Sequence, residues 1–187
     1  VAWDEKCYIG QGLYLFNTGN FKTDGFIYHG ALSYYLNSLF LIPLNIKTDA
    51  WSKDNCWDIG NDIIFHSNYN HKTIVFLSRL PFVFIAVLLG FYVFKWAKEL
   101  YGTPAGLFSL MLYSFSPNII ANSTMAMTDF ASVVFMFIAL YYFWNYIKHK
   151  KNIHVAATGI FVGLSSLSKL SGIYIFPILL LLSLSKD

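Results

Sequence analysis

Long apolar segments separated by short polar ones dominate the second half of the chain. Residues 75–97 are apolar apart from Arg79 near their start and Lys95 near their end, and further apolar segments cover residues 104–120, 129–147, 154–168 and 171–185. A membrane-spanning helix needs about 20 apolar residues, so the first three segments are long enough to cross a bilayer. The last two are shorter spans on either side of Lys169. The pattern predicts an all-α fold, a polytopic transmembrane helix bundle with about five spans.

The first 74 residues have a different pattern. Residues 1–27 mix polar and aromatic side chains with several glycines, and residues 45–74 hold most of the acidic groups. Residues 28–44 are apolar but short, and they include the polar His29 and Asn37. We therefore expect residues 1–74 to form an external loop, in which residues 28–44 are a juxtamembrane helix that does not cross the membrane.

The ends of the chain suggest that it is the N-terminal fragment of a longer protein. No leader precedes Val1, and the last residues stop at the end of an apolar run. We expect residues 1–187 to form a single membrane domain whose first helix and C-terminal part are missing.

The composition supports a membrane protein. The chain is 56% hydrophobic and only 12% charged, whereas soluble domains have about 25% charged residues. The net charge of +3 is small, and no basic stripe interleaved with aromatic residues indicates a nucleic-acid partner.

Lysines in the short loops predict the orientation. Lys95 lies at the end of the first span and Lys98 follows it, and Lys148, Lys150 and Lys151 follow the third. Because cytoplasmic loops carry an excess of basic residues, both loops should be cytoplasmic. Residues 1–74, residues 121–128 and Lys169 then lie outside. The sequence predicts a multi-pass protein of the plasma (inner) membrane with its charged groups on the external face.

Five charged residues meet at that face, namely Asp4, Glu5, Arg79, Asp129 and Lys169. An ionisable group inside a membrane costs about 2.5–3.5 kcal/mol on insertion scales, so each is a functional hypothesis. All five lie near the ends of the predicted helices, where this cost falls.

The carboxylates have alternative interpretations. Asp4 and Glu5 could hold a divalent cation, or one of them could act as a general base on a hydroxyl. They could equally be an ordinary solvated pair beside Lys6. Asp129 lies at a predicted helix start, where a negative charge is favourable by about 0.3–1 kcal/mol even without a catalytic role.

The basic groups and His29 are candidates for substrate binding. Arg79 could hold a phosphate through two hydrogen bonds, and Lys169 could neutralise one. Both side chains could instead extend to lipid head groups. His29 precedes a helical segment, and a lone histidine in such a place is more often an interfacial hydrogen bonder than a ligand. Cys7 and Cys56 both lie outside, where a disulfide can form, but the sequence leaves their pairing open.

Five motifs resemble one known family. The segments "WDEKCYIGQGLYLFNTGNF", "YHGALSYYLNSLF", "LSRLPFVFIAVLLGFYVFKWAKELYG", "SPNIIANSTMAMTDF" and "GIFVGLSSLSKLSG" follow one another in this order. They resemble the first external loop, the juxtamembrane helix and the following helices of the dolichyl-phosphate-mannose protein mannosyltransferase family (glycosyltransferase family 39, GT-C superfamily) and its bacterial relatives. The resemblance covers nearly the whole chain.

The resemblance implies an inverting glycosyltransferase. Such an enzyme takes a sugar from a polyprenyl-phosphate donor in the membrane lipid and passes it to a hydroxyl of a protein, lipid or glycan acceptor. It implies that Asp4 is the catalytic aspartate and that Glu5, Arg79, Asp129 and Lys169 match other family positions. One departure is that the family's double proline after His29 is replaced by Gly30 and Ala31, which puts a role for His29 in doubt.

A transporter or flippase of lipid-linked sugars is the main alternative. Such proteins favour charges or broken helices near the middle of the membrane and internal pseudo-symmetry. Here the charges gather at one face and no repeat is visible, which favours the transferase.

Overall fold

The structure, a computed structural model, describes residues 1–20 and 29–184 and is helical throughout, with no β-strand in the part that it describes. The elements in chain order are α1 (Trp3–Thr18), α2 (Ala31–Ser38), η2 (Ala50–Ser52), α3 (Cys56–Phe65), α4 (His71–Tyr101), α5 (Thr103–Ser114), α6 (Pro117–Ser123), α7 (Thr128–His149), α8 (Asn152–Ser168), η3 (Leu170–Tyr174) and α9 (Ile175–Leu184). Two predicted boundaries lie outside the described residues. They are Tyr28, the expected start of the juxtamembrane helix, and Ser185, the expected end of the last span.

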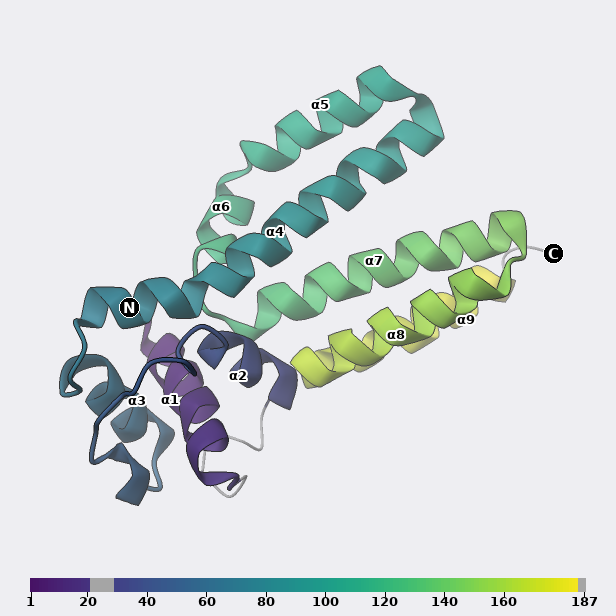
Figure 1. Cartoon of the computed structure of the whole chain (residues 1–187). Coiled ribbons are helices and arrows are strands. Elements are labelled where there is room, and N and C mark those ends of the chain that lie inside the picture. Colours follow the sequence, from purple (N-terminus) through teal and green to yellow (C-terminus); the bar gives the residue numbers. More distant parts are fainter. Residues whose placement is uncertain (21–28, 185–187) are drawn as a thin grey trace.

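Two helical arms extend from a cluster formed by α1, α2 and α3 (Figure 1). One arm is the antiparallel pair of α4 and α5, which turns at Gly102 with a φ of +88°. The other contains α7, α8 and α9, and the connection between α7 and α8 has Lys150 at a φ of 54°. Both turns lie at the ends of the arms far from α1, α2 and α3 (Figure 1). The junctions between α6 and α7 and between α8 and α9 lie at the opposite ends, beside the cluster.

Two helices are long and apolar enough to cross a membrane, by length and composition alone. They are α4, with 31 residues, and α7, with 22. At 1.5 Å per residue, α4 is long enough to cross a hydrocarbon core of about 30 Å and to project beyond it. The apolar helix α8 and the joined segment Leu170–Leu184 are shorter. The expected total of about five spans therefore stays a prediction.

Large apolar side chains cover the outer surfaces of both arms. Phe84 and Phe91 on α4, Phe108 on α5 and Leu181 on α9 are each more than half exposed. A soluble protein rarely exposes such extensive apolar surface. These helices therefore have the surface expected of a membrane protein.

The N-terminal region differs from the expected loop, because residues 3–18 and 56–65 form the helices α1 and α3. Three of the glycines in this region, Gly10, Gly12 and Gly60, lie where helices cross. A Cβ atom at Gly60 would lie 1.9 Å from the Lys6 carbonyl oxygen, and one at Gly12 would lie 2.1 Å from the Tyr34 carbonyl oxygen. The helix α1 therefore needs glycine for close approach to its neighbours, and the same residues do not interrupt it.

Two prolines shorten the apolar helices relative to the expectation. The helix α2 ends at Ser38 and is followed by turns as far as Leu44, and Pro43 disfavours helical backbone at Ile42 within these turns. The expected span 104–120 is divided into α5 and α6 with Pro117 at the start of α6, because proline lacks the N–H group that a continuing helix requires. The predicted break at Lys169 is confirmed, since this residue has extended backbone between α8 and η3.

The main core joins the N-terminal cluster to the arms. Ile9 of α1, Ile59 and Ile63 of α3, Phe82 of α4 and Val134 of α7 are each almost fully buried within one apolar cluster. This cluster connects α1 and α3 with α4 and α7 and so positions the residues described next.

Candidate functional site

A cavity of about 390 Å³ lies where the N-terminal cluster meets the ends of α7 and α8. This volume lies within the range of small-molecule sites. Its lining combines charged, aromatic and sulfur-containing side chains, namely Asp4, Cys7, Tyr8, His29, Trp57, Met127, Asp129 and Lys169. Four of the six residues predicted from the sequence as site residues therefore share one cavity: Asp4, His29, Asp129 and Lys169.

An ion pair between Lys169 and Asp129 forms one side of the cavity. The Lys169 ammonium group donates a hydrogen bond to Asp129 Oδ1. Asp129 lies in the first turn of α7, where the helix dipole favours a negative charge. Lys169 reaches it because α8 ends at Ser168 and the next residue is extended. The broken helix thus places a cation beside a carboxylate and next to open space.

Tyr8 and His29 form a second polar pair. The Tyr8 hydroxyl and His29 Nε2 are 3.2 Å apart and share a hydrogen bond, and the two rings meet edge to face. Burial and the positive charge of Lys169 lower the pKa of His29, so His29 is neutral at pH 7. Burial, together with the negative charge of Asp4, raises the pKa of Tyr8. Both groups can therefore exchange hydrogen bonds with a ligand as neutral partners.

Asp4 is the carboxylate that is left unpaired at this cavity. It is exposed in the first turn of α1, and it has no ion-pair partner among residues 1–20 and 29–184. A carboxylate that lines a cavity without a cation can accept a proton from a bound hydroxyl. The structure therefore leaves Asp4 available for the role expected of it.

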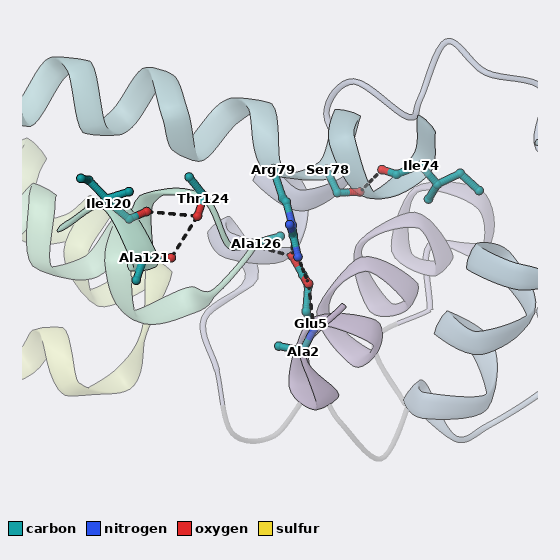
Figure 2. Close-up of polar contacts among 9 residues, drawn as sticks. All are labelled: Ala2, Glu5, Ile74, Ser78, Arg79, Ile120, Ala121, Thr124 and Ala126. Atoms are coloured by element: carbon teal, nitrogen blue, oxygen red, sulfur yellow. Dashed lines mark hydrogen bonds and ion pairs between the residues drawn. The ribbon is translucent and has the colours of Figure 1, made fainter. Parts of the chain in front are cut away.

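Glu5 has the opposite environment, although it is the next residue. Its side chain is fully buried, and its two oxygens accept hydrogen bonds of 2.7 Å each from Nε and Nη2 of Arg79 (Figure 2). The backbone N–H groups of Ala126 and Ala2 donate further bonds of 3.0 and 3.1 Å. Burial alone would raise the pKa of Glu5, but these donors outweigh it and lower the pKa below 4.5.

The chain before Ala126 is held in place to make this contact. The Thr124 hydroxyl donates to the carbonyls of Ile120 and Ala121 at the end of α6 (Figure 2). Glu5 therefore ties together α1, α4 and the segment that leads into α7.

The Glu5 contacts affect two predicted roles, namely phosphate binding by Arg79 and metal binding by Asp4 and Glu5. Arg79 is not among the cavity-lining residues and is committed to Glu5, which leaves Lys169 as the lining cation. A divalent cation shared by Asp4 and Glu5 would have to compete with Arg79 for both Glu5 oxygens. Within the described ranges, no group of three or more His, Cys, Asp or Glu residues is arranged to hold a metal ion.

Cys7 and Cys56 form a disulfide, which answers the question that the sequence left open. The bridge joins α1 to α3 at the wall of the cavity. Cys7 lies three residues after Asp4, and Cys56 immediately precedes Trp57. Disulfides persist in oxidising compartments. A bridge at this position agrees with the expected external location of the segment.

Comparison with known proteins identifies the family. A sequence model described as dolichyl-phosphate-mannose-protein mannosyltransferase matches residues 73–186, which is more than half of the chain. The chain belongs to this family. Searches of curated proteins and of solved structures gave no significant match.

Membership of the mannosyltransferase family makes this protein a membrane glycosyltransferase of the GT-C type. The matched region contains Arg79, Asp129 and Lys169, whereas Asp4 and His29 precede it. The cavity therefore combines residues inside the matched region with residues that only the N-terminal helices bring there.

Sequence reasoning did not identify Tyr8, Trp57 and Met127 as lining residues. Tyr8 lies one helical turn after Asp4, so helix periodicity could have found it once residues 3–18 were recognised as a helix. No sequence signal places Trp57 at the cavity, because its position depends on the pairing of Cys7 with Cys56.

Proposed function

We propose that the protein transfers a sugar from a polyprenyl-phosphate donor to an acceptor hydroxyl at the outer membrane face, with inversion at the anomeric carbon. The observation that carries this proposal is the convergence of an unpaired carboxylate, Asp4, and a cation, Lys169, on one cavity. Transfer requires both a proton acceptor and a group that stabilises a leaving phosphate.

The proposed reaction is a single displacement. The acceptor oxygen attacks the anomeric carbon and loses its proton to Asp4, while the bond from that carbon to the phosphate oxygen breaks. The electron pair of this bond leaves with the polyprenyl phosphate, whose charge Lys169 neutralises. Asp129 positions the Lys169 ammonium group through their ion pair. Attack from the side opposite the leaving group inverts the configuration.

A lipid carrier fits the surroundings of the cavity. Asp129 also lines a second cavity of about 260 Å³ between α4, α6 and α7. Ile119 lines both that cavity and an apolar groove of about 510 Å³ between α4, α5 and α6. The groove is lined by side chains such as Val83, Val87, Phe94, Leu110 and Tyr113. A charged cavity with apolar cavities nearby suits a phosphate with a hydrocarbon chain.

The position of the charges favours the transferase over a transporter. A transporter would hold its substrate near the middle of the membrane. Here the cavity lies at the ends of α7 and α8, beside the N-terminal cluster.

Replacement of Asp4 tests the proposal. Asn has nearly the shape of Asp but cannot accept the proton, and loss of a general base typically costs about 10²–10⁴-fold in rate. Asp4→Asn should therefore reduce sugar transfer at least about a hundredfold. The assay follows labelled mannose from dolichyl-phosphate-mannose in membranes with matched protein levels.

The control is Asp54→Asn, because Asp54 is an exposed aspartate outside the cavity. This variant should keep full activity. Full activity in Asp4→Asn would contradict the mechanism.

A further inference from the structure

One aromatic side chain at the cavity has no assigned role. Trp57 lies in the first turn of α3 and is 37% exposed. It lines the cavity with Asp4, Asp129 and Lys169 but contributes no charge. Its ring makes no stacking contact with another aromatic ring among the described residues, unlike the tyrosine and tryptophan rings packed between α4 and α7. The exposed part of the indole is therefore available to a ligand in the cavity.

The backbone of Trp57 is held in place by its two neighbours. The preceding residue, Cys56, is bonded to Cys7 of α1. The Asn55 side chain caps α3 and accepts a hydrogen bond of 2.9 Å from the Trp57 backbone N–H. These contacts fix the start of α3 against α1, so the indole is presented to the cavity from a rigid support. A binding surface gains affinity when it is ordered before the ligand arrives.

The other lining groups complement an aromatic surface. The carboxylates of Asp4 and Asp129 can accept hydrogen bonds, and the Lys169 ammonium group can donate them. A pyranose ring has hydroxyl groups around its edge and C–H groups on its faces. The faces of aromatic rings carry partial negative charge, which attracts polarised C–H groups. Charged groups beside an exposed indole therefore match both parts of a sugar.

We infer that Trp57 is the platform on which the sugar of the donor stacks, so that the cavity holds the sugar between the indole and the charged groups of α1 and α7. This inference rests on the proposed function, since the donor is taken to be a sugar on a lipid phosphate. Trp57 is thus a specificity-determining residue supplied by the acidic segment 45–74, and it precedes the matched residues 73–186.

Two lipids that differ only in the sugar test the inference. Binding of dolichyl-phosphate-mannose and of dolichyl phosphate is measured on the purified protein in lipid nanodiscs. In Trp57→Ala, binding of dolichyl-phosphate-mannose should weaken about tenfold, equivalent to about 1.4 kcal/mol, while binding of dolichyl phosphate stays unchanged. Trp57→Phe keeps an aromatic face and should retain most of the affinity for the sugar-bearing lipid.

Trp3→Ala is the matched control. Trp3 is 73% exposed and adjacent to Asp4, but it does not line the cavity, so its replacement should affect neither lipid. Formation of the Cys7–Cys56 disulfide, followed by mobility on non-reducing gels, confirms that each variant folds.

The outcomes separate the inference from the proposed function. Equal weakening of both lipids in Trp57→Ala would give this residue a role in membrane anchoring or folding and would overturn the inference. Unchanged binding of both lipids would overturn it as well. If the unaltered protein bound neither lipid, the donor class itself, and with it the proposed function, would fail.

Discussion

Asp4 and Glu5 show how neighbouring carboxylates acquire different chemistry. Successive residues of an α-helix point about 100° apart, so one side chain of α1 faces the cavity while the next faces the interior. Asp4 lies in contact with solvent, whereas Glu5 is fully buried against Arg79. The first suits proton transfer, and the second holds three segments together.

Glu5→Gln should destabilise the protein. The change removes the negative charge and leaves Arg79 without its partner, and breaking a buried ion pair typically costs about 3–5 kcal/mol. We expect a loss of about 3 kcal/mol, at the lower end of this range, because the Arg79 side chain is 32% exposed. Thermal unfolding in detergent measures the effect. The double variant Glu5→Gln with Arg79→Met should recover part of the loss, and an unchanged melting temperature in the single variant would contradict the structural role.

The same pair predicts a pH dependence. The pKa of Glu5 in the folded protein lies below 4.5, so the folded state binds fewer protons than the unfolded state as the pH falls through this region. The stabilisation is therefore complete above about pH 4.5 and is lost as the pH drops through the folded-state pKa. The difference in melting temperature between the unaltered protein and Glu5→Gln should shrink as the pH falls below about 4.5. A constant difference would exclude Glu5 as its source.

At the scale of elements, the crossing of α1 and α3 determines the shape of the cavity. Gly10 and Gly60 meet at this crossing, where a Cβ at Gly10 would lie 2.5 Å from the Gly60 backbone nitrogen. The disulfide joins the same two helices one turn away. Close backbone contact and a covalent link together keep Asp4 and Trp57 at one cavity.

Gly60→Ala should separate these helices. The added methyl group would overlap the Lys6 carbonyl oxygen, and overpacking of a core typically costs about 1–3 kcal/mol. We expect a lower melting temperature and incomplete formation of the disulfide on non-reducing gels. Gly159→Ala is the control, because a Cβ there meets no atom within 4 Å. Equal behaviour of the two variants would show that the crossing tolerates a side chain.

At the scale of the whole molecule, the lysine-rich turns and the cavity lie at opposite ends of the arms. The turns that follow α4 and α7 are remote from α1, α2 and α3 (Figure 1). Since Lys95, Lys98 and Lys148 precede these turns, the arrangement agrees with a cytoplasmic location for the lysines and an external location for the cavity.

Single-cysteine labelling tests this orientation. The described residues contain no free cysteine, so a new thiol can be labelled without removing the native pair. In intact cells a membrane-impermeant maleimide should react with Asp54→Cys and should reach Lys150→Cys only after permeabilisation. Labelling of Lys150→Cys alone in intact cells would reverse the orientation and place the cavity in the cytoplasm.

From the sequence alone, the apolar helices of the arms and the break at Lys169 could be predicted, but not the division of residues 104–120 into α5 and α6. Helices and breaks depend on local composition, because apolar length and helix-breaking residues act within one segment. Four of the residues that line the cavity were proposed from the predicted orientation and from the family resemblance. The tertiary structure was needed to show that Asp4 lines the cavity while Glu5 is buried, that Glu5 pairs with Arg79 and that Trp57 lies at the cavity. Each of these depends on contacts between segments distant in the sequence: Arg79 lies 74 residues after Glu5, and Cys56 lies 49 residues after Cys7. The glycines of α1 show the same division, since composition suggests a loop at these positions and only the packed neighbours reveal a helix crossing.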